Sequence, residues 1–218
     1  MSEFVTIEER VSTACHATNL KDDADRGSQT DVLKALAWSK SRLGGALLRL
    51  HSEFDAIEKP RKLAHDAMVR LVLSMRSDIQ DKAQNLKERE DMARREAAKW
   101  YANEKTLFLG KLKTLQGVVD QLAIQCEKWG IDDARKVATV IVGYWLDQIC
   151  PTCNGLKFEQ IPDSPVLSDK PCKACQGTGL STIPYGRAGD NLLAYIDDCV
   201  SRAQQSIKEK LKKHQNNA

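Results

Sequence analysis

The clearest pattern in the chain is a helical spacing of apolar residues through its middle. No proline occurs for 90 residues between Pro60 and Pro151, and apolar side chains recur there at intervals of three and four. This spacing is typical of a helix with coiled-coil character, interrupted by the charged run 87–91. It predicts a long central helix over about 62–108, with mixed-sign charges typical of a solvated surface. The apolar positions are Met68, Val72, Met75, Ile79, Ala83, Leu86, Ala93, Ala97, Trp100 and Leu107.

Shorter apolar patterns predict helices on both sides of this segment. Thr30 is a predicted N-cap with Asp31 in the first turn, and the apolar positions of 33–50 predict two short helices around Gly44 and Gly45. Near the C-terminus, residues 191–213 carry an apolar stripe that predicts a helix capped by Asp190. The stripe consists of Leu193, Ile196, Val200, Ala203, Ile207 and Leu211, and it also includes Cys199.

Residues 118–149 predict a helix, a turn and a second helix. Gly130 is expected just after the first helix, and Asp132 is expected to cap the second. A DNA-reading helix-turn-helix has the same outline. However, the apolar positions of the second helix, among them Val137 and Val140, indicate that this helix is buried. We therefore favour an ordinary helical hairpin.

These patterns predict a mainly α fold, a helical bundle with a long central helix and a metal-stapled loop that carries at most a short β-hairpin. Any strand is expected in residues 155–160 and 179–183, beside the cysteines described below. The predicted divisions are a flexible, polar N-terminal arm over 1–29, a helical region over 30–149, a metal-binding loop over 150–190 and a C-terminal helix over 191–218.

Composition narrows the class of protein. Of the 218 residues, 42% are hydrophobic and 29% are charged, as in a folded globular chain. No apolar run approaches the roughly 18 residues that a membrane span needs, and the start of the chain does not have the pattern of a signal peptide. We therefore expect no membrane partner and a cytoplasmic location, where paired cysteines favour metal or redox chemistry over disulfides. The net charge of +3 means that any nucleic-acid surface depends on local clustering of cations.

Two CxxC pairs carry the strongest chemical signal. The pairs are Cys150 with Cys153 and Cys172 with Cys175, in the stretches CPTCNG and CKACQGTG, and 18 residues separate them. Each pair brings two sulfurs to one point, and two pairs complete a tetrahedron around Zn²⁺. Each pair with the residues that follow it is called a knuckle here, and glycines after each second cysteine permit the sharp turn that a knuckle requires. The sequence therefore predicts one structural zinc ion with these four ligands.

Other uses of the cysteines fit less well. Neither pair has a strand before it and a helix after it, as a thioredoxin site does. Iron–sulfur ligation and two disulfides remain alternatives. A catalytic metal is disfavoured, because closed Cys₄ coordination leaves no open position for a substrate. Four thiolates and one Zn²⁺ carry a charge of about −2, which Lys157, Lys170 and Lys173 can offset. Cys15 and Cys126 have no assigned role, and Cys199 is expected in the core.

The rest of the chain shows no catalytic constellation. The four histidines are scattered, no HExxH motif is present, and no glycine-rich loop opens a helix. We therefore expect a protein that is not an enzyme.

Three segments together resemble the lambdoid bacteriophage antitermination protein Q family. They are TDVLKALAWSKSRLGGALL at 30–48, ARKVATVIVGYWLDQIC at 134–150, and the two knuckles followed by Ser181, Thr182, Ile183 and Pro184. The knuckle pattern resembles the CxxCxGxG zinc loop of DnaJ-type chaperones, so the order of the segments and the first segment carry the specificity. The resemblance covers about half of the chain.

The resemblance implies a phage or prophage regulator of transcription in the cytoplasm of a bacterial host. Such proteins bind double-stranded DNA at a late promoter, engage RNA polymerase with its sigma factor, and let it read through terminators. The alternatives are a zinc-ribbon chaperone or adaptor without a DNA role, although the chain has no HPD tripeptide, and a coiled-coil protein in which zinc only staples a loop. The long central helix makes self-association a further expectation.

Candidate DNA contacts follow from the position of cations relative to the zinc loop. Lys170, Lys173 and Arg187 lie in one short stretch near the metal ligands, where they either contact phosphates or only balance the charge of the site. Arg135 and Lys136, at the start of the helix before the zinc, are the second choice. That helix was expected to bury Val137 and Val140, which weakens the second choice.

Overall fold

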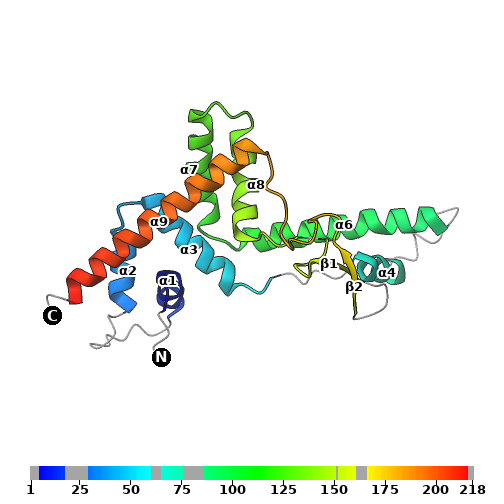
Figure 1. The fold of residues 1–218 in the computed structure, drawn as a ribbon, viewed down its shortest axis with the longest axis horizontal. Coiled ribbons are helices and arrows are strands. Elements are labelled where there is room, and N and C mark those ends of the chain that lie inside the picture. The colour runs from blue at the N-terminus through cyan, green and yellow to red at the C-terminus, as the bar shows by residue number, and fades with distance from the viewer. Residues whose placement is uncertain are drawn as a thin grey trace. The chain divides into compact units, whose positions relative to one another are not determined.

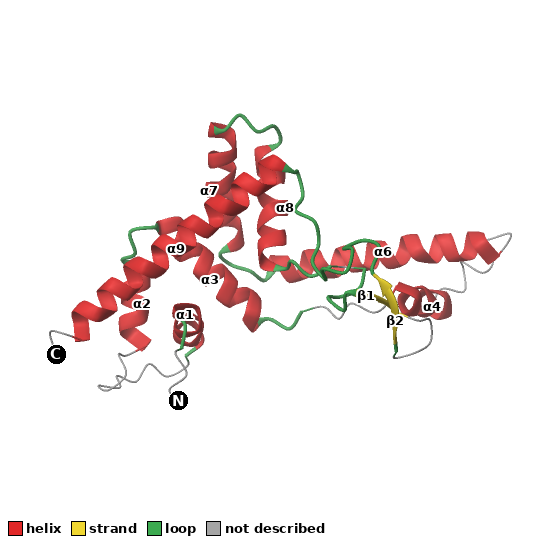
Figure 2. Ribbon diagram, in the orientation of Figure 1, coloured by secondary structure: helices red, strands yellow, loops and turns green. Residues whose placement is uncertain are grey.

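The structure is a computed structural model that describes residues 5–17, 29–59, 65–75, 86–150, 152–160 and 166–215. Within these ranges the chain is mainly helical with one small sheet, which confirms the predicted fold class (Figure 2). The chain divides into two compact units, Met1–Ile57 with Lys113–Ala218, and Glu58–Leu112. None of the described helices combines the length and the apolar character needed to cross a bilayer.

The first unit contains most of the elements (Figure 1). Its helices are α1 (Ile7–His16), α2 (Gln29–Ala37), α3 (Arg42–Ala56), α7 (Leu115–Lys128), α8 (Ala134–Leu146) and α9 (Arg187–Gln215). Its strands, β1 (Phe158–Gln160) and β2 (Leu167–Pro171), form an antiparallel pair. Helices α1, α2, α3 and α8 all contact α9, which therefore organises the unit.

The apolar stripe of α9 is the centre of the core. Ile196, Cys199, Ala203 and Ile207 are buried, as the spacing predicts, and Leu192 rather than Leu193 occupies the first buried position. Leu47 and Leu50 of α3 are fully buried, and α3 packs on α9. The helix begins at Arg187, so Asp190 lies in its first turn and is not the cap that the sequence predicted.

Helix α3 approaches α9 very closely at Gly44. A Cβ atom at this position would lie 1.9 Å from the carbonyl oxygen of Cys199, which only glycine avoids. The two short helices expected around Gly44 and Gly45 are wrong, because both glycines lie inside α3. The break between helices lies at 38–41 instead, and Ser41 caps α3 by accepting a hydrogen bond from the Gly44 N–H at 3.1 Å.

The expectation of a flexible arm over 1–29 is wrong for residues 7–16, which form α1. Ile7, Val11 and Ala14 are buried, and α1 contacts α2, α3 and α9. Thr6 and Glu9 form a capping box that starts the helix. This signal is present in the sequence as Thr-Ile-Glu-Glu. Residues 18–28 of the expected arm lie outside the described residues. Thr30 lies inside α2 and is not its cap.

Helices α7 and α8 form the helical hairpin that the sequence favoured over a helix-turn-helix. They contact each other and run in opposite directions, joined by a short turn (Figure 1). Gly130 follows the end of α7 with a φ of 70°, as expected. The N-cap of α8 is Asp133, one residue after the predicted Asp132.

The second unit contains α4 (His65–Met75) and α6 (Leu86–Gly110), which pack against each other. The long helix expected over about 62–108 exists as α6, which has 25 residues and includes the charged run 87–91. Because α4 packs against α6, however, these two segments are not one continuous helix. The connection between them, 76–85, lies outside the described residues.

The contact at Gly44 generates a stability prediction. Gly44→Ala places a methyl group against the backbone of α9, and we expect it to lower the free energy of unfolding by about 1–3 kcal/mol, the usual cost of overpacking a core. Gly143→Ala is the matched control, because a Cβ there meets nothing within 4 Å. In a helix that change should raise stability by about 0.5–1 kcal/mol. Chemical denaturation of both variants checks this, and equal effects of the same sign would contradict the close packing of α3 and α9.

Candidate metal centre

The four predicted ligands come together between the end of α8 and the start of α9. Cys150 and Cys153 follow α8, and Cys172 and Cys175 follow β2; the loops that carry them lie around the small sheet in Figure 2. Their Sγ atoms all lie within 4.8 Å of one another. Each residue is between 1% and 4% exposed. The sequence prediction that these four cysteines converge is confirmed.

The distance between sulfurs fits metal coordination and excludes a disulfide. The Sγ atoms of Cys153 and Cys175 lie 3.7 Å apart. A tetrahedral ion with metal–sulfur distances of about 2.3 Å places its ligands about 3.8 Å apart. A disulfide requires about 2.05 Å. The four thiols are therefore free cysteines arranged as a metal-ion site.

The two knuckles have the same backbone conformation. In each, the first, second and fourth residues after the second cysteine have a positive φ. These residues are Asn154 (49°), Gly155 (81°) and Lys157 (70°) in the first knuckle, and Gln176 (51°), Gly177 (83°) and Gly179 (79°) in the second. Each second cysteine also accepts a hydrogen bond at its carbonyl from the N–H three residues later, at 2.9 and 3.0 Å.

Reciprocal hydrogen bonds join the knuckles to each other. The N–H of Cys150 donates to the carbonyl of Gly179 at 2.9 Å, and the N–H of Cys172 donates to the carbonyl of Lys157 at 2.8 Å. Each knuckle thus holds the first cysteine of the other. Gly179 holds Cys150, and Lys157, at the equivalent position, holds Cys172. The metal module, defined here as residues 148–160 and 166–181, therefore has approximate two-fold symmetry in its backbone.

The strands follow the same symmetry. Phe158 of β1 pairs with Pro171 of β2, and the equivalent positions, Leu180 and Ile149, form an isolated bridge. The strand expected within 155–160 is confirmed as β1, whereas 179–183 contributes only the bridge at Leu180. The sequence prediction did not include β2, which lies between the two segments where strands were expected.

The pKa values of two of the thiols, Cys175 and Cys153, differ strongly when no metal ion is bound. Burial tends to raise the pKa of Cys175, but the N–H groups of Gly179 and Gly177 and the thiol of Cys153 lower this pKa to about 6. The Gly179 N–H lies 3.3 Å from that sulfur. Burial and the neighbouring sulfurs raise the pKa of Cys153 to about 11. A bound metal ion must displace the Cys153 proton, so metal affinity rises with pH.

The sequence analysis gave Lys157 only a charge-balancing role and missed the role of its backbone in this site. Its position after Cys153 matches that of Gly179 after Cys175, and the fixed spacing could have revealed it. A non-glycine residue in this left-handed conformation costs about 1–2 kcal/mol. The cost is tolerated because the Lys157 carbonyl completes the bond to Cys172.

The candidate DNA contacts fall in three places. Lys170 and Lys173 lie exposed on the metal module, and Lys173, whose side chain is 90% exposed, forms an ion pair with Glu159 at 3.6 Å. Arg187 is the first residue of α9 and is also exposed. The structure thus places Lys170 and Lys173 together, as expected, and sets Arg187 on a separate element.

Arg135 and Lys136 lie at the opposite end of α8 from Cys150. Both are exposed, and Arg135 forms an ion pair with Asp120 at 3.0 Å. The argument against this pair was that α8 must bury Val137 and Val140, and it is wrong for Val140, which is 38% exposed. Val137 is buried as expected.

The remaining cysteines lie away from the metal module. Cys126 and Cys199 are buried in helical packing, which confirms the expectation for Cys199, and Cys15 is exposed. The four ligands are the one cluster of potential metal-binding side chains found in the described part of the chain.

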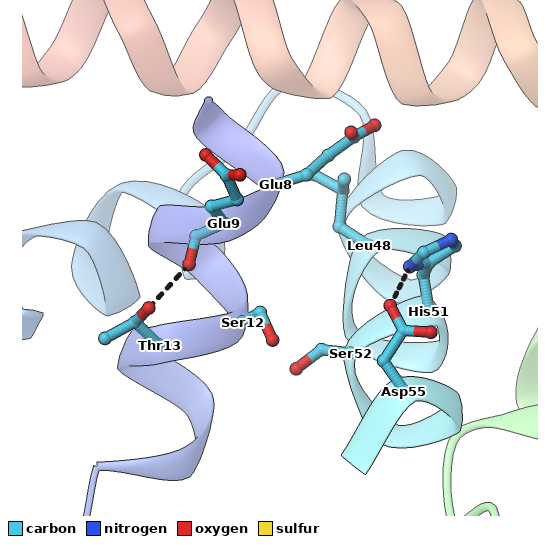
Figure 3. A pocket seen from close by; sticks show the side chains of 8 residues that line it. All are labelled: Glu8, Glu9, Ser12, Thr13, Leu48, His51, Ser52 and Asp55. Carbon is cyan, nitrogen blue, oxygen red and sulfur yellow. Dashed lines mark hydrogen bonds and ion pairs between the residues drawn. The ribbon is translucent and has the colours of Figure 1, made fainter. Parts of the chain in front are cut away.

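A hollow lies between α1 and α3, and polar side chains that line it have partners in the structure (Figure 3). Glu9 accepts a hydrogen bond from the Thr6 N–H at 2.7 Å, and Glu8 accepts one from Gln204 at 2.8 Å. His51 pairs with Asp55 at 2.9 Å. Each of these groups therefore already has a partner within the first unit.

Comparison with known proteins gives no assignment. No protein-family model matches the chain, and no curated protein and no solved structure matches it.

The symmetry of the knuckles predicts opposite effects of two substitutions. Lys157→Gly relieves a left-handed conformation and should leave the metal-loaded chain as stable or up to about 1 kcal/mol more stable. Gly179→Ala should cost about 1–2 kcal/mol, because it imposes the same strain. Its Cβ would also lie 3.0 Å from the carbonyl oxygen of Gly155. Thermal unfolding of both variants checks this. A tolerated Gly179→Ala together with a destabilising Lys157→Gly would contradict the symmetric backbone.

Proposed function

We propose that the four cysteines hold one structural Zn²⁺ and that the chain is a phage or prophage transcription antitermination factor. The chemistry of the donors supports zinc, since four thiols whose sulfurs lie within 4.8 Å of one another suit a closed zinc site. Such a site leaves no position for substrate, so the ion would fix the backbone rather than take part in a reaction.

The observation that carries the proposed function is the packing of the three segments that resemble the antitermination family. Residues 30–48 form α2 and the start of α3, residues 134–150 form α8 and lead to Cys150, and 181–184 lead into α9. Helices α2, α3 and α8 all contact α9. The segments that carry the resemblance are therefore parts of one compact unit centred on α9.

In this proposal the metal module presents cations to promoter DNA. Lys170 and Lys173 extend from a backbone that the zinc ion would hold rigid, and Arg187 begins the following helix. Lysine and arginine side chains at such positions bind phosphates and orient the protein on the duplex. Arg135 and Lys136 are the alternative phosphate contacts.

The surface proposed for RNA polymerase is the outer face of the α7–α8 hairpin. Ile124 and Val140 are exposed there, at 52% and 38%. Exposed aliphatic side chains on two adjacent helices are suited to a protein partner, since contact removes them from water.

One observation favours a second candidate, a zinc-ribbon chaperone or adaptor. Apolar side chains on the metal module are between 40% and 49% exposed: Ile149, Leu156, Phe158 and Leu180. A module that grips unfolded chains would present such side chains. This candidate predicts binding of apolar peptides and no binding of DNA.

The zinc proposal predicts a metal content close to one zinc ion per chain. Metal analysis of protein purified under reducing conditions measures it directly. Cys172→Ser removes one of the four thiolates and should release the ion, whereas Cys15→Ser, at an exposed cysteine outside the cluster, should retain it. Protein that is free of metal as purified, or that carries iron in place of zinc, would refute this part of the proposal.

The DNA proposal predicts a salt dependence that identifies the contacts. For a duplex carrying the late promoter of the encoding phage or prophage, loss of one phosphate contact lowers the magnitude of the slope of log affinity against log salt by roughly 0.9. Lys173→Gln and Arg187→Gln should each weaken the mobility shift and flatten this slope, with zinc content unchanged. Chelation of the metal should abolish the shift.

Control variants separate the two candidate DNA surfaces. Arg135→Gln and Lys136→Gln should leave the slope unchanged if the metal module makes the contacts. If only these two variants flatten the slope, the DNA surface lies at the start of α8. A wild-type chain that shifts no promoter DNA and does not increase terminator read-through by bacterial RNA polymerase would refute the antitermination proposal.

A further inference from the structure

We propose that the surface around Trp38 binds single-stranded nucleic acid. The Trp38 surface is formed by the turn between α2 and α3 together with the C-terminal part of α9, and its main residues are Lys34, Trp38, Lys40, Lys210 and Lys213. Lys213 lies two turns after Ser206, on the face of α9 that contacts the turn. This inference does not rest on the proposed function, because it concerns other residues and another form of nucleic acid.

The two segments of this surface are joined by hydrogen bonds. The Nζ of Lys210 donates to the carbonyl of Trp38. The N–H of Lys40 donates to the hydroxyl of Ser206, a buried residue of α9, at 3.2 Å. Figure 1 shows the last turns of α9 beside α2, in agreement with the contacts between these helices. Residues far apart in sequence therefore form one surface.

Positive charge is concentrated here. Residues 34–42 and 208–213 hold seven lysine and arginine side chains and a single carboxylate, Glu209, whereas the whole chain has a net charge of only +3. The one ion pair recorded for these cations joins Lys34 to Asp31 at 4.0 Å, and it leaves the Lys34 side chain 65% exposed. The sequence alone explains the basic end of α9 by the helix dipole. The dipole does not explain why Lys40 and Arg42 follow Trp38 within four residues.

Trp38 is the most exposed of the large hydrophobic residues recorded, at 76%. Its backbone nevertheless makes two hydrogen bonds. The Trp38 N–H donates to the Lys34 carbonyl at 3.0 Å, and the Lys210 side chain donates to the Trp38 carbonyl. The next residue, Ser39, is buried and donates from its hydroxyl to the Ser41 carbonyl at 2.8 Å. The indole is thus presented to solvent from a fixed backbone, although burial of a large apolar side chain is worth about 1.5–3 kcal/mol.

An exposed indole among lysines is suited to unpaired bases. Every base has a flat face that can stack on tryptophan, and cations alongside bind the phosphates of the same strand. In a duplex the base faces are already stacked on one another, so Trp38 would add nothing to the binding of double-stranded DNA. The cations account for affinity in general, and Trp38 accounts for a preference for single strands.

The test is fluorescence anisotropy with the full, zinc-loaded chain and labelled 20-nucleotide oligothymidylate and oligouridylate. Trp38→Ala should weaken binding by about 5- to 150-fold, the range for loss of one aromatic–base stack, and Trp38→Phe should retain most of the affinity. Trp100→Ala is the matched control, because Trp100 is also exposed, at 48%, but lies on α6 among mixed charges. It should bind as the wild type does.

Salt dependence tests the cations separately. Lys40→Gln with Lys213→Gln should reduce the magnitude of the salt slope for single strands by about 1.4, since each neutralised contact contributes roughly 0.7. Affinity for a 20-base-pair duplex should not change with Trp38→Ala. The two oligonucleotides then show whether the surface prefers DNA or RNA.

Several results would overturn the inference. One is equal binding of single strands by wild type and Trp38→Ala, and another is an equal loss of affinity in Trp100→Ala. Weakening of duplex binding by Trp38→Ala to the same degree would remove the preference for single strands. Binding of anionic lipid vesicles without binding of either oligonucleotide would assign the surface to membranes. Because Lys173 lies outside this surface, promoter binding can fail while single-strand binding succeeds, and the reverse.

Discussion

The constraint on which the metal module depends is the confinement of four thiol groups in one buried space. Their sulfurs lie within 4.8 Å of one another, and the small strands beside them bury little else. Four thiolates at such distances repel one another strongly unless a cation lies between them or protons remain bound. Because one knuckle follows α8 and the other leads through Ser181 toward α9, an ion at this point links the ends of two core helices. The Tyr144 hydroxyl of α8, which donates to the Ser181 carbonyl at 3.4 Å, supports the same junction.

The approximate two-fold symmetry explains why two differently written stretches form the same structure. Each knuckle supplies the carbonyl that fixes the first cysteine of the other, so neither is complete alone. A metal ion bound by the four cysteines would act on the same backbone as these two hydrogen bonds, and loss of either is expected to loosen both halves. In the first half a lysine occupies the left-handed position at 157, which shows that the pairing outweighs the strain of about 1–2 kcal/mol.

Sequence patterns predicted the ligands and the core of α9 well, because both depend on local spacing. The CxxC pairs and the three- and four-residue periodicity of Ile196, Ala203 and Ile207 require no knowledge of distant contacts. The errors arose where tertiary contacts decide. Gly44 and Gly45 resemble a helix break, but Gly44 allows α3 to approach α9. The omission of α1 had a different cause, since Thr6 and Glu9 form a capping box that is readable in the local sequence. The Trp38 surface could not be predicted, since its two halves are separated by more than 160 residues of sequence.

Two kinds of surface thus surround one α9-centred unit: a metal module with Lys170 and Lys173, and the Trp38 surface. Both depend on α9, which begins just beyond the module and ends beside Trp38. The central claim of the account is that the metal module is a closed tetrathiolate zinc site. X-ray absorption at the zinc edge of the purified chain tests this claim most directly. The account predicts four sulfur neighbours at about 2.3 Å and no nitrogen or oxygen ligand. A spectrum with three or fewer sulfurs, or with a bound water, would contradict it.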